Sequence, residues 1–229
     1  MDPILPSALA STLRRIENAA RACDRPIPRL LAVSKLQPAA AVAALAAQGQ
    51  LAFGENYVQE AAAKTAETAS LGLEWHLIGH LQSNKANIAA RLFDWIQTVD
   101  RTKLVTALAK HRDAARPPLN VLIQVNVDDE ASKAGCHPDE VDALADAIAA
   151  ESSLVLRGLM AIPTPHADVE LRRPAFRRMK VLFDALAARH PRADTLSMGM
   201  SDDFELAIAE GATMVRIGTA LFGARPSRP

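Results

Sequence analysis

The sequence predicts a closed (β/α)8 TIM barrel that is preceded by one extra N-terminal helix. Short apolar runs alternate with longer segments of helical periodicity eight times along the chain, and no two strand-like runs follow one another. This alternation is typical of a parallel sheet covered by helices. Eight units within 229 residues average fewer than about thirty residues each, which suits a barrel. A doubly wound open sheet is the alternative, but it fits less well because no Gly-x-Gly-x-x-Gly follows the first strand.

The bulk composition limits the class of protein. The chain is 49% hydrophobic, and 26 Lys and Arg residues balance 26 Asp and Glu residues, so no overall charge favours nucleic acid or anionic lipid. No apolar run approaches the ~20 residues needed to span a bilayer, and residues 1–6 lack the pattern of a signal peptide. Cys23 and Cys136 have no metal-ligand spacing and are expected to be free thiols. We therefore expect a cytoplasmic protein without a membrane or nucleic-acid partner.

The first two elements are a leading helix and a buried strand. The helix is expected over residues 7–22, where Leu9, Leu13 and Ile16 recur at helical spacing between arginines. Residues 30–33 are a continuous apolar run with too little polarity for a surface strand. They are therefore expected to form the first strand of the barrel.

The remaining elements follow in regular alternation. Pro38 suits the first turn of a helix over residues 39–48, which Gly49 ends. Later strands are expected at residues 51–56, 74–79, 95–99, 120–127, 154–162, 195–199 and 214–218. The following helices are expected at residues 57–69, from about 84, 103–115, 138–150, 169–189 and 202–210, with a short helical turn at 220–223. The breaks between elements are marked by Pro117, Pro118, Pro138 and Gly211. No linker interrupts this pattern, so residues 1–229 are expected to form a single domain.

The first strand is expected to end at Lys35, which lies on the face that Leu31 and Val33 share. A charged lysine that continues an apolar face is costly to bury, and desolvation lowers its pKa from the reference value of ~10.4. The resulting neutral amine is the nucleophile that a carbonyl-condensing lysine requires. A lysine that simply reaches from the strand end to water is the simpler interpretation of this stretch alone.

In a barrel of this class, residues just past the carboxyl ends of the strands form the active face. The sequence places mostly polar or small groups there. They are Lys35, Asn56, His80, Asp100, residues 126–128, Pro163, residues 199–201, Gly218 and Thr219.

The last two strand ends suit a phosphate group. Arg216 is expected to point into the barrel, where its guanidinium needs an acceptor, either a carboxylate or a ligand atom. Gly218 and Thr219 precede a short helical turn, and backbone N–H groups at a helix start bind anions. Ser201 lies in the loop after the seventh strand, where it is either the N-cap of the next helix or a second phosphate contact. In barrels, these two loops often hold a phosphate.

Other polar groups are weaker candidates. His76 and His80 share strand parity, but two histidines without a third ligand indicate packing or hydrogen bonding rather than zinc. The acidic residues at 128–130 and 202–203 could bind a cation, although helix starts and exposed loops explain them more simply.

Seven segments resemble the pyridoxal-phosphate homeostasis protein family, single-domain relatives of the alanine racemase N-terminal barrel. They are Leu31-Ala-Val-Ser-Lys35, Phe53-Gly-Glu-Asn-Tyr-Val-Gln-Glu60, Trp75-His-Leu-Ile-Gly-His-Leu-Gln-Ser-Asn-Lys85, Ser132-Lys-Ala-Gly135, Arg157-Gly-Leu-Met160, Leu196-Ser-Met-Gly-Met-Ser-Asp-Asp203 and Arg216-Ile-Gly-Thr-Ala-Leu-Phe-Gly223. The resemblance extends over nearly the whole chain.

The resemblance implies a site for pyridoxal 5′-phosphate (PLP) in a barrel of the alanine racemase N-terminal type. The cofactor is expected as a Schiff base on the lysine that matches Lys35. Phosphate contacts are implied for the residues that match Ser201, Gly218 and Thr219, and Arg216 matches an arginine that faces the pyridine nitrogen. Two further residues are assigned to motifs near the cofactor, Asn56 and Lys133.

The same resemblance, together with the general chemistry of PLP, implies that the catalytic activity of this protein is weak. An arginine does not give up its proton, so Arg216 would leave the ring nitrogen unprotonated and weaken the electron sink. Alanine racemases also use a tyrosine from a second domain, whereas this sequence ends at Pro229 and its one tyrosine is Tyr57. We therefore expect a protein that holds, buffers or delivers PLP, with apo PLP-dependent enzymes as candidate recipients, and with no robust activity. The alternative is a weak amino-acid racemase, with His80 or Lys133 as base, or a lysine aldolase. A monomer is expected, with weak dimerisation as the alternative.

Overall fold

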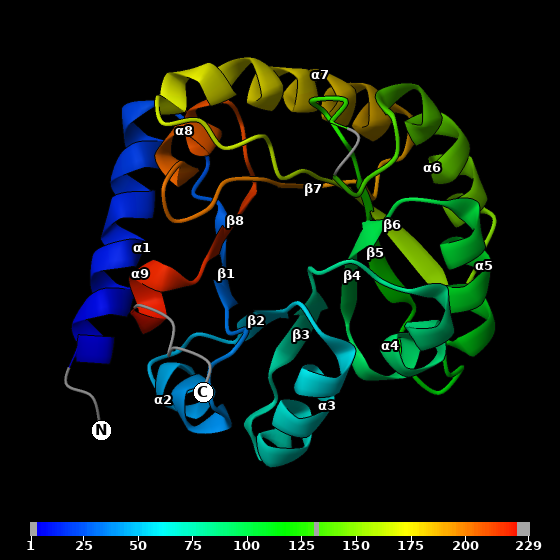
Figure 1. Cartoon of the computed structure of the whole chain (residues 1–229), viewed down its shortest axis with the longest axis horizontal. Helices are drawn as coiled ribbons and strands as arrows, with labels where there is room; N and C mark the ends of the chain where they lie inside the picture. The colour runs from blue at the N-terminus through cyan, green and yellow to red at the C-terminus, as the bar shows by residue number, and fades with distance from the viewer. Residues whose placement is uncertain (1–3, 131–132, 224–229) are drawn as a thin grey trace.

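The computed structural model describes residues 4–130 and 133–223, and these form a closed barrel of eight parallel strands. Figure 1 shows the strands enclosed by a ring of helices. The strands are β1 (Arg29–Val33), β2 (Ala52–Glu55), β3 (Glu74–Leu77), β4 (Trp95–Val99), β5 (Leu119–Gln124), β6 (Leu154–Met160), β7 (Thr195–Ser197) and β8 (Met214–Ile217). β1 closes the barrel by pairing with β8, with Leu31 opposite Arg216. The predicted fold class is therefore confirmed.

The helices alternate with the strands as the sequence predicts. They are α1 (Ile4–Ala22), α2 (Ala39–Ala46), α3 (Val58–Glu67), α4 (Ala86–Leu92), α5 (Thr102–His111), α6 (Val141–Ala149), α7 (Arg173–Arg189), α8 (Phe204–Ala209) and α9 (Thr219–Phe222). Short 3-10 turns precede three of them, namely η2 (Ser83–Lys85), η3 (Pro138–Glu140) and η4 (Val169–Arg172), and η1 (Ala69–Leu71) follows α3. None of the described helices has the length and apolar character that a membrane crossing requires.

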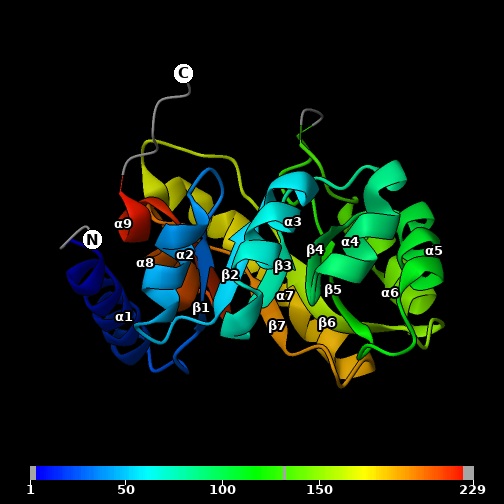
Figure 2. The ribbon, with the colours of Figure 1, turned by 90° about the horizontal axis from the view of Figure 1, so that it is seen from below.

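The extra helix α1 packs against α8, α9 and α2, beside the seam between β1 and β8 (Figure 1 and Figure 2). Its Leu9 and Ile16 are buried, with 4% and 1% of their surface exposed. Leu13, in contrast, is 45% exposed. The helical spacing correctly predicted the helix, but Leu13 lies outside the buried stripe formed by Leu9, Thr12, Ile16 and Ala20.

The strands are shorter than the sequence indicates at their carboxyl ends. The first, fifth and sixth strands were expected to reach residues 35, 127 and 162, but β1 ends at Val33, β5 at Gln124 and β6 at Met160. Val125 instead forms an isolated bridge with Cys136, so the chain leaves the sheet early and turns over the barrel mouth. Apolar character continues past the last ladder pairs because Val125, Val127 and Ala161 remain buried, whereas Ile162 is 38% exposed. Cys23 and Cys136 are free thiols, as expected, and burial raises the pKa of Cys136 to about 12.

Alternation along the strands gives the barrel two different faces. Outward-facing residues such as Phe53, Leu77 and Leu196 belong to a continuous core between the sheet and the helices. Inside the barrel, two small apolar clusters are centred on Leu31 and Leu122. Buried polar side chains also occupy the interior, among them His76, Gln97, Ser197 and Arg216. The barrel interior therefore contains polar side chains that can hydrogen bond to groups at the carboxyl ends of the strands.

Candidate functional site

A cavity of about 350 Å³ opens at the carboxyl ends of the strands, where a barrel of this class places its site. It is lined by Val33, Lys35, Gln37, Asn56, Ile78, Ile162, Met200, Ser201, Asp202, Arg216, Gly218, Thr219, Phe222 and Gly223. The predicted cofactor-binding residues Lys35, Asn56, Ser201, Arg216, Gly218 and Thr219 are all among them, whereas Lys133 is not. The volume falls within the range of about 300–1,000 Å³ that is usual for small-molecule sites.

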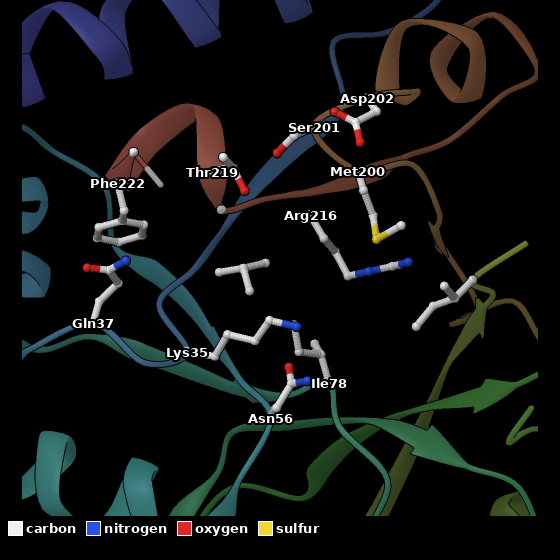
Figure 3. Close-up of a pocket in the computed structure, with 14 residues that line it drawn as sticks. Lys35, Gln37, Asn56, Ile78, Met200, Ser201, Asp202, Arg216, Thr219 and Phe222 are labelled. Atoms are coloured by element: carbon white, nitrogen blue, oxygen red, sulfur yellow. The ribbon is translucent and has the colours of Figure 1, made fainter. Parts of the chain in front are cut away.

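The view in Figure 3 separates the polar groups of the cavity into two sides. Lys35 and Asn56 lie together, and Ser201 and Thr219 lie across the cavity from them. The Arg216 side chain extends between the two sides. Lys35 is half-buried and lines the cavity together with Val33, its neighbour on the same face of the chain. The cavity thus combines an amine, an amide, two hydroxyls and a guanidinium.

Arg216 is held inside the barrel with only 3% of its surface exposed. Its Nη1 donates to Ser197 Oγ at 2.7 Å, and its Nη2 donates to the Ala161 carbonyl oxygen at 2.8 Å. The expected acceptor was a carboxylate or a ligand atom, but both acceptors are uncharged protein oxygens. Burial lowers the pKa of Arg216 to about 10, and the charge of Asp203 partly offsets this effect. The guanidinium is therefore still protonated at neutral pH.

A chain of hydrogen bonds continues from Arg216 through the barrel. Ser197 Oγ donates to Gln97 Oε1 at 2.7 Å, and Gln97 Nε2 lies 2.9 Å from His76 Nδ1. The other ring nitrogen of His76 contacts Glu74. Because the Gln97 amide nitrogen is a donor, His76 must accept at Nδ1 and carry its proton on Nε2. Burial lowers the pKa of His76, which keeps the ring neutral. A neutral ring has one donor and one acceptor nitrogen, so the donor and the acceptor of each hydrogen bond in this network are fixed.

The two histidines singled out by the sequence are far from equivalent. His76 is fully buried and stacks on Trp95 with ring centroids 5.1 Å apart. His80 is half-exposed, with its Nδ1 3.9 Å from Asp100, and it does not line the cavity. Ile78, two residues earlier, lines the cavity in its place. The described residues contain no group of three or more His, Cys, Asp or Glu side chains that could hold a metal ion.

The loop after β7 is shaped by residues that the sequence did not assign. α8 begins at Phe204, and Asp203 is its N-cap residue, so the interpretation of Ser201 as that N-cap is wrong. Asp203 Oδ1 accepts from the Met200 N–H at 2.7 Å, and Asp203 Oδ2 accepts from Arg172 at 2.6 Å. Asp203 is buried, and this pairing leaves Ser201 facing the cavity. Asp202 lines the cavity beside Ser201 (Figure 3).

Gly199 and Gly218 allow the two loops to approach the cavity closely. Gly199 has φ +91°, and a Cβ there would lie 2.6 Å from the Ala207 side chain. Gly218 is the N-cap residue of α9, and Thr219 is the first residue of that short helix. The loops after β7 and β8 therefore meet at the cavity with Ser201, Gly218 and Thr219, as the sequence predicts.

Lys133 does not line the cavity, which differs from its expected place near the ring. Its Nζ donates to Thr164 Oγ1 at 2.7 Å and lies 3.1 Å from Glu130 Oε2. These contacts hold the lysine within the loops after β5 and β6. Ser132, which begins the same motif, lies outside the described residues.

The fold and the lysine-containing cavity define a barrel of the alanine racemase N-terminal type. Residues 6–226 match the family described as alanine racemase, N-terminal domain. An alanine racemase from Corynebacterium glutamicum shares the fold with a TM-score of 0.68 at 20% identity, over 96% of this chain and 62% of that one.

Much closer relatives are small proteins of similar length. Proteins named pyridoxal phosphate homeostasis protein from Escherichia coli K12 and Pseudomonas aeruginosa PAO1 are 52% and 53% identical, over 95% of this chain and 95% and 94% of theirs. The structure of PipY from Synechococcus elongatus with PLP bound superposes with a TM-score of 0.83 at 37% identity, covering 96% of this chain and all of that one. The chain belongs to the pyridoxal phosphate homeostasis protein family.

Proposed function

We propose that this protein binds PLP in the described cavity and holds, buffers or delivers that cofactor in the cytoplasm. The observation that carries the proposal is the convergence of Lys35, Arg216, Ser201 and Thr219 on one cavity of suitable size. A solved relative at 37% identity contains PLP, and close relatives are named for its homeostasis. The residues present fit the cofactor, because an aldehyde, a phosphate and a ring nitrogen each find a complementary group.

Each polar residue of the cavity has one role in this proposal. The Lys35 amine holds the cofactor covalently as a Schiff base, and Asn56 lies beside it. Ser201 and Thr219 donate hydroxyl hydrogen bonds to the phosphate, with the backbone N–H groups around Gly218. Arg216 presents its guanidinium to the ring nitrogen.

We further propose that the protein has no robust catalytic activity. Bound PLP supplies an electron sink, whose strength depends on protonation of its ring nitrogen. The protonated Arg216 is a hydrogen-bond donor without an acceptor site, so it does not protonate that nitrogen. Among the described residues that line the cavity there is no tyrosine, no histidine and no second lysine, and the carboxylate of Asp202 lies beside the phosphate contacts. No specific observation favours the racemase or aldolase alternative.

The covalent assignment is tested with Lys35→Ala. Wild-type protein is expected to be yellow, and the variant is expected to be colourless. After reduction of the wild-type protein with borohydride, mass spectrometry should locate the pyridoxyl group on Lys35. A label found wholly on Lys133 or on another lysine would contradict the assignment.

The carrier role is tested by incubating the yellow protein with L-alanine in deuterated water. Only slow exchange of the α-proton and little D-alanine are expected, because a missing acid–base group typically costs about 10²–10⁴-fold in rate. Exchange at ordinary enzyme rates that is abolished by Lys35→Ala would restore the enzyme interpretation. Transfer of PLP to an apo PLP-dependent enzyme, followed by recovery of that enzyme's activity, would support delivery.

A further inference from the structure

Three charged side chains form a cluster between β2 and α3, named here the Glu55–Lys64–Glu60 cluster, in which Glu55 and Lys64 are buried and Glu60 is partly buried. Lys64 is only 5% exposed, and its Nζ lies 2.7 Å from both Glu55 Oε1 and Glu60 Oε1. Glu55 is fully buried, and its Oε2 has no hydrogen-bond partner among the described residues. Burial raises the pKa of Glu55 even though Lys64 and Ser34 hydrogen bond to it.

Burying charged side chains in such a cluster is unfavourable in free energy. Removing charges from water costs several kcal/mol for each ion, and apolar side chains of similar volume are often equally stabilising or better. None of the three residues lines the cavity. Stability alone therefore does not account for the cluster, and neither does direct contact with a ligand.

All three residues contact the backbone or side chain of the residues that flank Lys35. Lys64 Nζ donates to the Ser34 carbonyl oxygen at 2.6 Å, and Ser34 Oγ donates to Glu55 Oε1 at 2.6 Å. On the other side, the Leu36 N–H donates to Glu60 Oε1 at 2.5 Å. Ser34 is buried on the helix side of the barrel wall, whereas Lys35 lines the cavity. The cluster therefore fixes both peptide groups of Lys35 from behind.

Leu36 shows that this attachment holds a strained conformation. Its φ is +64°, in the left-handed region, which is unfavourable for residues with a Cβ. Such conformations persist only when the surroundings over-determine them, and they concentrate at functional sites. Two hydrogen bonds hold this turn: the Gln37 N–H donates to the Ser34 carbonyl oxygen at 3.0 Å, and the Leu36 N–H donates to Glu60.

We propose that Glu55, Lys64 and Glu60 are positioning residues that aim the Lys35 amine at the cofactor aldehyde. The proposal rests on the proposed function, because it takes Lys35 as the attachment point. The residues do not touch the cofactor. They act by holding Ser34 and Leu36, so that Lys35 meets the aldehyde in one orientation.

The test compares two ligands that differ only where Lys35 acts. PLP has an aldehyde, and 4′-deoxypyridoxine 5′-phosphate has a methyl group in its place and cannot bond to a lysine. Dissociation constants for both are measured by titration of wild-type protein, Glu60→Ala, Glu60→Gln and the control Glu67→Gln, which changes an exposed residue of the same helix. Glu60→Ala is expected to reduce the preference for PLP about tenfold or more, the effect of one lost hydrogen bond to a charged group. Its affinity for the deoxy ligand should change little.

The outcomes distinguish a failure of the positioning role from a failure of the proposed function. Full retention of the preference in Glu60→Ala, or equal weakening of both ligands, would overturn the positioning role. If Glu60→Ala does not fold, Glu60→Met carries the test by the same criterion, because it fills a similar volume without an acceptor oxygen for the Leu36 N–H. Glu60→Gln keeps an acceptor oxygen and should lose less of the preference than either variant. Equal affinity of wild-type protein for both ligands would instead show that Lys35 does not capture the aldehyde, so the proposed function itself would fail.

Discussion

Thr219 is the residue whose hydroxyl, in the proposed function, distinguishes a phosphorylated ligand from an unphosphorylated one. Thr219→Val keeps the shape of the side chain and removes its hydrogen bond. Losing a charge-assisted bond to the phosphate should weaken PLP by ~1.5–3 kcal/mol and affect pyridoxal far less. Titration with both ligands measures the difference. Thr102→Val is the matched control, because Thr102 begins α5 after β4 as Thr219 begins α9 after β8. Equal weakening of PLP and pyridoxal would place the phosphate elsewhere.

His76 makes stability depend on pH. Burial lowers the pKa of His76 in the folded protein, so the unfolded chain takes up a proton more readily. A group with a lowered folded pKa stabilises the protein above its unfolded pKa, about 6.5, and loses that contribution as the pH falls below it. The free energy of unfolding of wild-type protein should therefore decrease between about pH 7.5 and about pH 5.5.

The matched variant His76→Gln removes this titration but keeps a polar side chain in the barrel. Its free energy of unfolding should fall less over the same pH interval, as measured by urea denaturation. Burial raises the pKa of Glu74, but in the wild-type protein its hydrogen bond to His76 and the charge of Arg29 outweigh burial and lower that pKa, so Glu74 is ionised across the interval. The ion pair of Glu74 with Arg29, at 2.8 Å, does not involve His76. Equal losses in both proteins would mean that His76 is not the group responsible.

At the level of elements, α1 contributes to stability through a narrow buried stripe. Ile16 is 1% exposed and packs in the main core, so Ile16→Ala should cost about 2–5 kcal/mol of the free energy of unfolding. Leu13→Ala, three residues away on the same helix, removes a similar side chain that is 45% exposed. It should cost less than about 1 kcal/mol. Chemical denaturation of both variants measures the difference, and equal costs would refute this orientation of α1.

At the level of the whole molecule, ligand binding should stabilise the barrel across its closing seam. The cavity takes residues from both sides of the β1–β8 pairing, including Lys35 and Arg216. A ligand at about 100 times its dissociation constant adds ~2.7 kcal/mol of stability, which corresponds to roughly 5–10 °C in the thermal midpoint for a protein of this size. Differential scanning fluorimetry with PLP measures the shift. Lys35→Ala at the same PLP concentration should show a smaller one, and equal shifts would argue against covalent capture.

The order of elements and the residues at strand ends could be predicted because both depend on local patterns. Lys35 and Arg216 follow from strand parity, and Gly218 and Thr219 follow from the last strand's end. Ser201 was predicted in the loop after the seventh strand, where it lies, but its alternative role as an N-cap residue was wrong. The N-cap residue of α8 is Asp203, which accepts a hydrogen bond from Arg172 on another element.

Other features of the site depend on contacts between elements, and no local pattern announces them. From the sequence, Lys64 is expected only as one residue of a helix. Its side chain becomes buried because α3 packs behind β1 and β2. A glutamate at an outward, buried strand position, Glu55, was the available signal. Lys133 shows the opposite case, because its loop contacts hold it away from the cavity lining. The extent of the single domain and the expected monomer remain predictions.

The lining of the cavity comes from two distant parts of the chain. Apart from Ile162, every lining residue lies within residues 33–78 or 200–223. During synthesis on a ribosome, the lysine therefore emerges long before the loops that would receive the phosphate. A nascent chain that has not yet exposed residue 219 has the amine of Lys35 but lacks part of the proposed phosphate contacts. With the site residues proposed above, complete capture of the cofactor therefore requires that translation has passed the last strand and that the barrel has closed.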